Sequence, residues 1–300
     1  MLKLKDVSVV YKDKTVLNKL SLTAEKGEII GLVAPNGTGK TTLFNVMANF
    51  LKPNSGTVTF NGMLEYKTEK EELAIRKQLV SFPDQSDLFE ELTGVDHLHL
   101  YGNLWKGTTK HIPEIIEQLK MTGYVKKKVS TYSLGMRQRL CFAMMVAADT
   151  PIMLMDEVMN GLDISNVDLI SKRLVRMKAE EKLIFVASHL LENLDLYADR
   201  VLFLKEGIII HQQRLEESTE DYIKIELEPA EYQKLSNEYS LPENHLYIAN
   251  HLCCIPIAHM KLSEQTIWIE RLLSYKGKEL TIGPLGTVEY YEKYYLEGSQ

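Results

Sequence analysis

Short apolar runs separated by polar, glycine-containing segments recur along the first two thirds of the chain. The runs lie at residues 29–33, 79–82, 152–155 and 183–187, and their length and apolar character are typical of strands buried in a parallel sheet. At the start of the chain, Leu2 and Leu4 alternate with lysines, as in a half-exposed strand of an antiparallel edge. We therefore predict an α/β fold with a mostly parallel sheet, crossover helices and an antiparallel β edge.

Two further segments differ from this pattern. From residue 91 to about 148 the pattern is helical, which predicts a small α-helical subdomain. After Arg214 an acidic stretch, EESTEDY, leads into Ile223, Ile225 and Leu227, which alternate as in a strand. A helix, two more strands and a Tyr-rich last helix follow, near residues 231–239, 251–257 and 266–269 and at the end of the chain. We predict a large first domain at 1–212 and a small α+β appendage at 215–300.

Composition limits the classes of protein that remain. The longest uninterrupted apolar stretch, 140–148, falls far short of the ~20 residues that span a bilayer, so any role in transport needs a separate membrane partner. The start of the chain has no apolar signal core, so we expect it to stay in the cytoplasm. The net charge is −6 and the basic residues are scattered, so we expect no nucleic-acid partner.

A glycine-rich loop follows the first buried run. The segment APNGTGKT matches the phosphate-binding pattern G-x-x-x-x-G-K-[ST], with Ala34 in place of the first glycine. Gly37 and Gly39 let backbone N–H groups turn inward around an anion, and the helix that follows directs its positive end at the phosphates. The predicted nucleotide-binding residues are Ala34, Asn36, Gly37, Thr38, Gly39, Lys40, Thr41 and Thr42. Lys40 is expected to reach the β and γ phosphates, and Thr41 to bind Mg²⁺.

Two acids end the third buried run. Asp156 and Glu157 directly follow residues 152–155, and the carboxyl end of a strand is where an open α/β sheet places its ligand. Ser188 and His189 end the next run in the same way. The sequence thus predicts that acids, a histidine and the phosphate loop meet at one sheet edge.

The segment from Ser130 onward resembles the ATP-binding subunits of ABC transporters. YSLGM at 132–136 is similar to the LSGGQ signature of that family, with Leu134 in place of its first glycine, and NGLD at 160–163 is similar to its D-loop. The resemblance covers Met1 to about Gln212, and its motifs follow one another in the family's order. It implies a P-loop NTPase fold with ATP and Mg²⁺ as cofactors.

The resemblance also implies a role for each matching residue. It makes Asp156 a metal ligand, Glu157 the residue that polarises the attacking water, and His189 a sensor of the γ phosphate. Ser133, Gly135 and Asp163 would act across a head-to-tail dimer on the ATP held by the other subunit. Tyr11 lies where the family carries an aromatic residue that stacks on adenine.

One position stays open. The family's glutamine before the helical subdomain, counted back from Leu92 and Thr93, falls on Asp84, with Gln85 one residue later. Either side chain offers an oxygen to Mg²⁺ or to the attacking water.

Two functions are compatible with these features. The first is the ATPase of a transporter, with export favoured because YSLGMRQRL followed by an appendage resembles the subunits of bacterial drug and antibiotic-peptide exporters. It would lie on the cytosolic face of the membrane, bind a separate permease, and form a homodimer or a heterodimer with a similar ATPase. The second is a soluble ABC ATPase, for example in cofactor assembly, since such members are also single and compact.

Overall fold

The computed structural model describes residues 1–215 and 220–296, so part of the acidic stretch after Arg214 lies outside the described residues. The chain divides into two compact units, Met1–Gln212 and Gln213–Gln300, and each has a hydrophobic core of its own. Within the described ranges, no helix is both long enough and apolar enough to cross a membrane.

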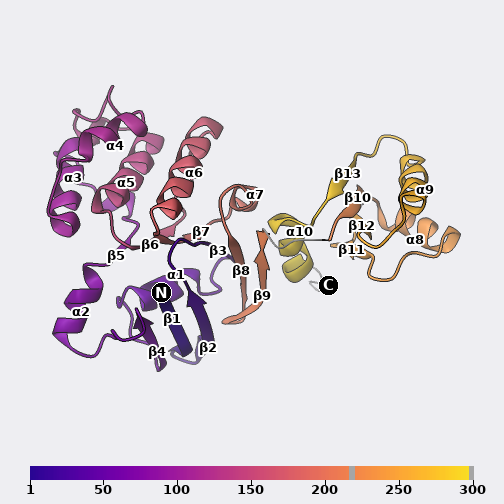
Figure 1. Cartoon of the computed structure of the whole chain (residues 1–300), viewed down its shortest axis with the longest axis horizontal. Helices are drawn as coiled ribbons and strands as arrows, with labels where there is room; N and C mark the ends of the chain where they lie inside the picture. Colours follow the sequence, from indigo (N-terminus) through magenta and orange to yellow (C-terminus); the bar gives the residue numbers. More distant parts are fainter. Residues whose placement is uncertain (216–219, 297–300) are drawn as a thin grey trace. The chain divides into compact units, whose positions relative to one another are not determined.

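The first unit is built on a six-stranded sheet (Figure 1). Its order is β5 (Leu79–Ser81), β6 (Ile152–Asp156), β7 (Leu183–Ala187), β3 (Ile29–Val33), β8 (Arg200–Lys205) and β9 (Ile208–Arg214). The strands from β5 to β8 pair in parallel, and every residue of β3 and β7 is buried. The predicted parallel sheet is therefore confirmed, and burial on both faces explains why these strands read as continuous apolar runs.

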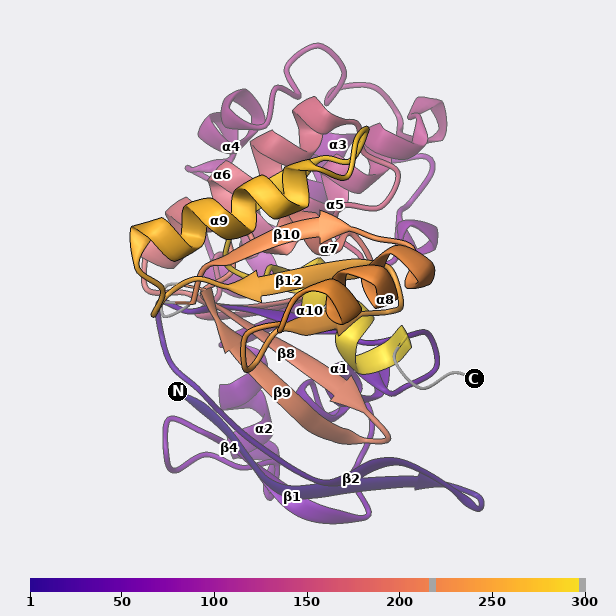
Figure 2. The same cartoon turned by 90° about the vertical axis from the view of Figure 1, so that its right-hand side faces the viewer.

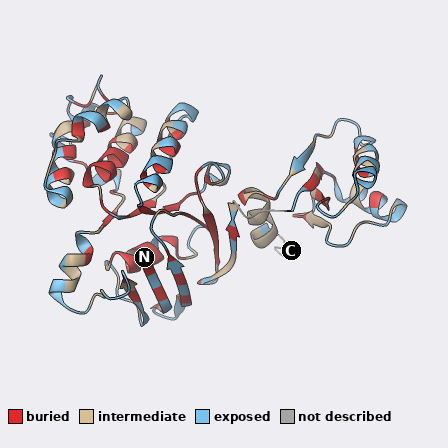
Figure 3. Ribbon diagram, viewed as in Figure 1, coloured by how far each residue is buried: buried red, intermediate tan, exposed pale blue. Residues whose placement is uncertain are grey.

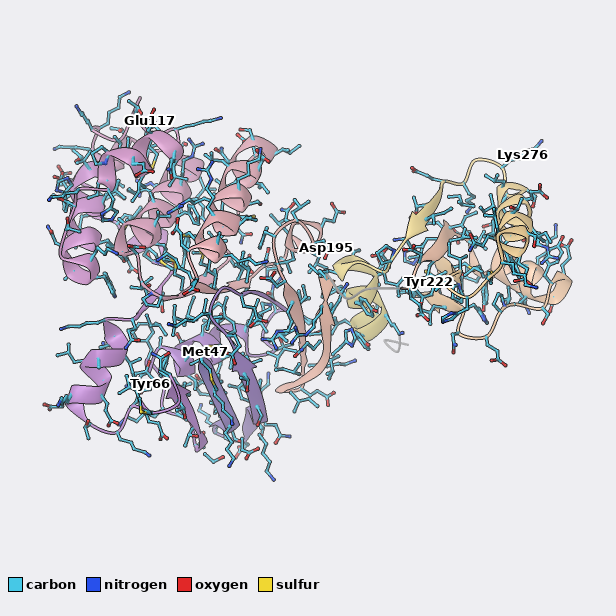
Figure 4. The ribbon with its side chains drawn as sticks, viewed as in Figure 1. Met47, Tyr66, Glu117, Asp195, Tyr222 and Lys276 are labelled. Atoms are coloured by element: carbon cyan, nitrogen blue, oxygen red, sulfur yellow. The ribbon has the colours of Figure 1, made fainter. Side chains whose placement is uncertain are left out.

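The predicted antiparallel edge is a separate sheet of three strands. Its order is β2 (Lys14–Ala24), β1 (Leu2–Tyr11) and β4 (Ser55–Phe60). Leu2 and Leu4 are buried, whereas Lys3 and Lys5 are exposed, as their alternation predicts. The buried faces of the two sheets share one core with α1 (Lys40–Met47). At its margin, the Tyr66 hydroxyl donates to the Met47 carbonyl oxygen over 2.7 Å (Figure 4).

The helical subdomain lies between β5 and β6 in sequence. It contains α3 (Gly94–Tyr101), α4 (Ile112–Gln118) and α5 (Leu134–Ala148), together with the π-helical turn η2 (Gly102–Lys106) and two 3₁₀ turns, η1 (Gln85–Asp87) and η3 (Val129–Thr131). The remaining helices of the unit are α2 (Glu69–Arg76), α6 (Ile164–Ala179) and α7 (Leu191–Leu194). Helix α5 is buried along most of its length (Figure 3), which explains why its sequence from Leu140 to Ala148 is apolar on all sides.

The second unit has the strand and helix order βαββαβ. The elements are β10 (Tyr222–Glu226), α8 (Pro229–Glu238), β11 (Leu246–Ile248), β12 (Leu252–Pro256), α9 (Leu262–Leu273) and β13 (Leu280–Gly283). The sheet order is β11-β12-β10-β13, all antiparallel. This is the split βαβ arrangement of ferredoxin-like domains. The predicted α+β class of the appendage is confirmed.

Successive residues of these strands point to opposite faces of the sheet, and each face packs against different helices. Ile223 and Ile225 of β10 pack with Trp268 of α9 and Leu235 of α8, and Figure 2 shows both helices in front of the sheet. Tyr222, which directly precedes Ile223 and therefore points to the opposite face, packs instead toward α10 (Thr287–Tyr291), which is followed by the π-helical turn η5 (Glu292–Leu296). Both faces of the sheet are therefore covered.

One local prediction in this unit is wrong. The predicted strand at 266–269 lies inside helix α9. Trp268 and Leu272, four residues apart, are the buried positions of that helix, so the apolar residues follow a helical period. A short apolar run does not distinguish a strand from a buried helix face.

Candidate active site

The phosphate loop joins β3 to α1 and wraps around the amine of Lys40. The Nζ atom of Lys40 donates to the carbonyl oxygen of Ala34 over 2.5 Å and to that of Pro35 over 3.3 Å. Lys40 is 7% exposed. Burial lowers the pKa of its amine, and the carboxylates of Glu157 and Asp156 partly offset this effect. The fold thus holds a cation at the N-terminus of a helix, where an anion is already favoured.

The backbone of the loop explains its glycine requirement at one position. Gly39 has a φ of 114° and is the N-cap of α1, and a Cβ there would lie 3.1 Å from Val16. Ala34 is not among the described residues with a positive φ, and its methyl group is buried in the core. Alanine at the first motif position is therefore compatible with an ordinary backbone.

A cavity of about 530 Å³ opens in front of this loop. The carboxyl ends of β6 and β7 and the start of α1 meet at this cavity. Its lining consists of Val16, Asn36, Gly37, Gly39, Lys40, Thr41, Thr42, Asp156, Glu157, Asn160 and His189. The structure therefore brings six of the eight predicted phosphate-loop residues together with the predicted acids and histidine.

The cavity contains a pair of oxygen groups suited to a hard cation. The Thr41 hydroxyl donates to Oδ2 of Asp156 over 2.9 Å. A hydroxyl and a carboxylate are among the oxygen ligands that Mg²⁺ accepts, and it needs few of them because it retains water. These two residues therefore fit the requirements of a Mg²⁺ site.

Glu157 lies beside this pair in an unusual backbone conformation. Its φ is 54°, in the left-handed region, and its Oε1 lies 2.9 Å from Nε2 of His189. Burial raises the pKa of the Glu157 carboxyl, His189 lowers it and Asp156 raises it. A partly buried carboxylate with a raised pKa is a competent proton acceptor near neutral pH. The next two residues, Val158 and Met159, are fully buried and anchor the loop that follows Glu157.

Several predicted site residues lie elsewhere in the described chain. Tyr11 is 46% exposed at the end of β1 and does not line the cavity. Ser133, Gly135 and Asp163 also lie outside it. Ser133 is the N-cap of α5, and its hydroxyl accepts from the Met136 N–H over 3.3 Å. Asp163 is the N-cap of α6. Within the same chain Ser133 and Asp163 begin helices and Gly135 lies in the first turn of α5. Ala34 and Thr38 also lie outside the cavity lining; the carbonyl oxygen of Ala34 accepts from Lys40, and the Thr38 hydroxyl donates to the carbonyl oxygen of Pro35 over 2.7 Å.

Asp84 and Gln85 line a second cavity, of about 420 Å³. This cavity shares Asp156, Glu157 and Asn160 with the first. Asp84 caps η1, and two hydrogen bonds from Ser86, each of 2.7 Å, lower the pKa of its carboxyl. Gln85 donates instead to the side chain of Gln138. Both candidates thus face the acids. The carboxylate of Asp84 accepts hydrogen bonds within its own turn, whereas the amide of Gln85 bonds to another helix.

Among the residues that line these cavities, the sequence interpretation missed Val16, Asn160 and Gln138, together with Phe82 and Pro83 after β5. Val16 projects from β2 toward the phosphate loop, Asn160 follows Glu157 by three positions, and Gln138 lies inside the buried helix α5. Only Asn160 had a local signal, because it belongs to the segment that resembles the D-loop. Val16 and Gln138 are brought near by tertiary folding.

The fold and the cavity define a P-loop nucleotide-binding protein. Residues 17–160 match the family model described as ABC transporter. The chain is 32% identical over 248 residues to the uncharacterized ABC transporter ATP-binding protein YhcH of Bacillus subtilis, covering 80% of each chain. It is 29% identical to the doxorubicin resistance ATP-binding protein DrrA of Mycobacterium tuberculosis, covering 65% of this chain and 59% of that one. The chain belongs to the family of ABC transporter ATP-binding proteins, and it is an ATPase.

A solved structure agrees with this assignment at the level of the fold. The ATP-binding cassette MJ0796, in a dimeric post-hydrolysis state bound to ADP and Pi, matches with a TM-score of 0.65 at 24% identity. The match covers 72% of this chain and 99% of that one. The first unit is therefore an ATP-binding cassette in its architecture.

Proposed function

We propose that this chain is the motor subunit of an ABC exporter, that two such cassettes close around two ATP molecules, and that their closure drives a separate membrane subunit. The observation that carries the proposal is the convergence of Lys40, Asp156, Glu157 and His189 on one cavity. We assign the ATP chemistry to residues 1–212 and regard 215–300 as an accessory domain.

The proposed roles follow from the contacts in the cavity. Lys40 and the backbone N–H groups of the phosphate loop bind the phosphates, while Thr41 and Asp156 hold Mg²⁺, which neutralises charge on the transferred phosphoryl group. Glu157 accepts a proton from the attacking water. His189 keeps the Glu157 carboxylate in place through its 2.9 Å contact and donates to the γ phosphate.

The positions of Ser133, Gly135 and Asp163 support a dimer. The hydroxyl of Ser133 and the first N–H groups of α5 form a second anion-binding helix start, and Ser133 is exposed. A site of this kind, outside the chain's own ATP cavity, has a role if it contacts the ATP of a second cassette. The related cassette MJ0796 is dimeric, which is consistent with this arrangement.

A groove away from the ATP cavity supports a membrane partner. It has a volume of about 270 Å³ and is lined mainly by apolar side chains from the turn after α1 and from α2, β5 and η2. Phe50, Leu73 and Leu104 contribute to it and are each more than half exposed, and Arg76 and Lys77 lie at its margin. Exposed apolar clusters of this kind mark interaction surfaces. We propose that the groove receives a helical segment of the membrane subunit on its cytosolic side.

Export is proposed because a relative of this chain is named for doxorubicin resistance. The proposal is tested by purifying the full chain with ATP in mild detergent from its native membranes. A stoichiometric integral-membrane protein is the expected result, and its substrate cavity then identifies the cargo. A chain recovered without any membrane protein contradicts the transport proposal and favours a soluble ABC ATPase.

A further inference from the structure

A buried glutamine connects two parts of the ATP site. Gln138 lies in the second turn of α5 and is 3% exposed. Its Nε2 donates to the main-chain carbonyl oxygen of Glu157 over 2.8 Å, and its Oε1 accepts from Nε2 of Gln85. One side chain therefore joins the helix that begins after Ser133 to the loop after β5 and to the residue that follows β6.

Chemistry fixes the direction of both hydrogen bonds. A carbonyl oxygen can only accept, so the end of the Gln138 amide that faces Glu157 is the nitrogen. The oxygen end then faces Gln85, which must present its own nitrogen. This bond uses the amide nitrogen of Gln85 and leaves its side-chain carbonyl oxygen available. The orientation of Gln85 in the cavity is thus set by a carbonyl group two side chains away.

The same contact helps to hold the backbone of Glu157. The N–H of Glu157 donates to the carbonyl oxygen of Ala187 over 2.9 Å, and its carbonyl oxygen also accepts from the Asn160 N–H over 3.1 Å. Gln138 adds a side-chain bond to these two main-chain bonds. The left-handed φ of 54° is rare for glutamate, and such conformations persist only where the surroundings impose them.

We propose that Gln138 is a positioning residue for ATP hydrolysis. It keeps the backbone of Glu157 in its left-handed conformation and turns the side-chain oxygen of Gln85 toward Asp156 and Glu157. A shift of helix α5 is thereby transmitted to both Glu157 and Gln85. The inference rests on the proposed role of Glu157 as the base. Gln138 itself does not line the phosphate-loop cavity, so it is expected to affect turnover and not the affinity for ATP.

The first test compares two variants of nearly equal size in the full chain. Gln138→Met removes the donor, and Gln138→Glu places a carboxylate oxygen against the Glu157 carbonyl. We expect kcat to fall about tenfold to hundredfold, as for other small misplacements of a catalytic group, with the larger loss in Gln138→Glu and an unchanged KM for ATP. Met145→Leu, a volume-conserving change at a fully buried position of the same helix, is the matched control and should retain wild-type kcat. Wild-type kcat in Gln138→Met, or an equal loss of ATP affinity, overturns the proposal.

A second test leaves the buried position intact. Gln85 is half-buried, so Gln85→Glu and Gln85→Ala are both expected to fold. If Gln85 acts only by offering an oxygen to a cation or a water, Gln85→Glu is the milder change. If Gln138 orients it, Gln85→Glu is the more severe one, because its carboxylate repels Oε1 of Gln138 and turns that amide away from Glu157. We expect kcat to be lower in Gln85→Glu than in Gln85→Ala, and the reverse ranking contradicts the proposal.

Glu157→Gln separates this inference from the proposed function. Loss of turnover in Glu157→Gln with normal turnover in Gln138→Met leaves the base assignment intact and rejects only the positioning role. Full turnover in Glu157→Gln rejects the base assignment itself.

Discussion

The Nε2 atom of His189 lies 2.9 Å from Oε1 of Glu157, and this contact joins the ends of two neighbouring parallel strands. Glu157 directly follows β6, and His189 lies two residues beyond β7. Parallel strands present their carboxyl ends at one edge of a sheet. The proposed base and the proposed phosphate-sensing group, which are far apart in sequence, are thereby held together without any long loop.

Glu157→Gln is expected to abolish steady-state ATP hydrolysis while ATP binding remains. The amide retains the size of the side chain but cannot accept a proton from water, and loss of a general base costs about 10²- to 10⁴-fold in rate. Phosphate release by the purified chain measures the rate, and size-exclusion chromatography with ATP detects the expected stable dimer. Hydrolysis at the wild-type rate would show that another group activates the water.

The pH dependence of turnover is expected to follow the carboxyl of Glu157. Burial raises the pKa of this group, and His189 lowers it. A base acts only when ionised, so kcat is full above this pKa and falls as the pH drops through it. Because the pKa is raised, the fall begins at a higher pH than for an exposed carboxyl.

His189→Ala removes a group that lowers this pKa, so the acid limb of the kcat profile should move to higher pH in the variant. His99→Ala, at an exposed position of α3, is the matched control and should leave the limb in place. A limb that stays fixed or moves to lower pH in His189→Ala excludes Glu157 as the group that titrates.

Lys40→Ala is expected to weaken ATP binding itself. The variant loses a buried amine at the phosphate loop, and charged hydrogen bonds contribute about 1.5–3 kcal/mol, which corresponds to roughly tenfold to hundredfold in Kd. Titration with a fluorescent ATP analogue gives the affinity. Lys26→Ala, an exposed lysine before β3, should bind as the wild type does. Equal affinities of the Lys40→Ala variant and the wild type would contradict the phosphate cradle described above.

Much of this site could be predicted from sequence because its motifs are local. Lys40, Thr41, Asp156 and His189 each lie at the end of a strand or the start of a helix, where short-range spacing specifies their positions. Gln138 could not be assigned in this way, because its two partners lie 53 and 19 residues away. Such contacts are fixed by how helices pack and not by spacing along the chain.

The appendage shows the same limit for the fold. Its class follows from alternation in Ile223 and Ile225, and its βαββαβ order was not predicted. The segment at 266–269 belongs to an amphipathic helix whose buried side contains Trp268 and Leu272. A segment of four residues is too short for its pattern of apolar and polar positions to distinguish a helix from a strand.

Substitutions at Gly39 and at Ala34 of the phosphate loop are predicted to have different effects on ATP binding. Gly39→Ala is expected to lower ATP affinity, since a side chain at a φ of 114° is strained by about 1–2 kcal/mol and its Cβ would approach Val16 at 3.1 Å. Ala34→Gly restores the family's usual residue but relieves no strain, because the backbone there is already ordinary. We expect no gain in affinity or turnover from Ala34→Gly. A clear gain would mean that Ala34 is strained in the ATP-bound loop.

The apolar groove gives the prediction that bears most directly on transport. Phe50 and Leu104 are 66% and 62% exposed on its walls, so an aspartate at either position is tolerated by the free chain but places an unpaired charge in a buried interface. Each such charge is expected to cost several kcal/mol of binding. Phe50→Asp and Leu104→Asp should therefore abolish co-purification with the membrane subunit, while ATP hydrolysis by the isolated chain stays at the wild-type rate. Met63→Asp, at an exposed apolar residue outside the groove (81% exposed), is the control and should still co-purify. If the groove variants retain the membrane protein as the control does, the partner binds another face of the cassette, and the exposed apolar side chains of Phe50 and Leu104 need a different explanation.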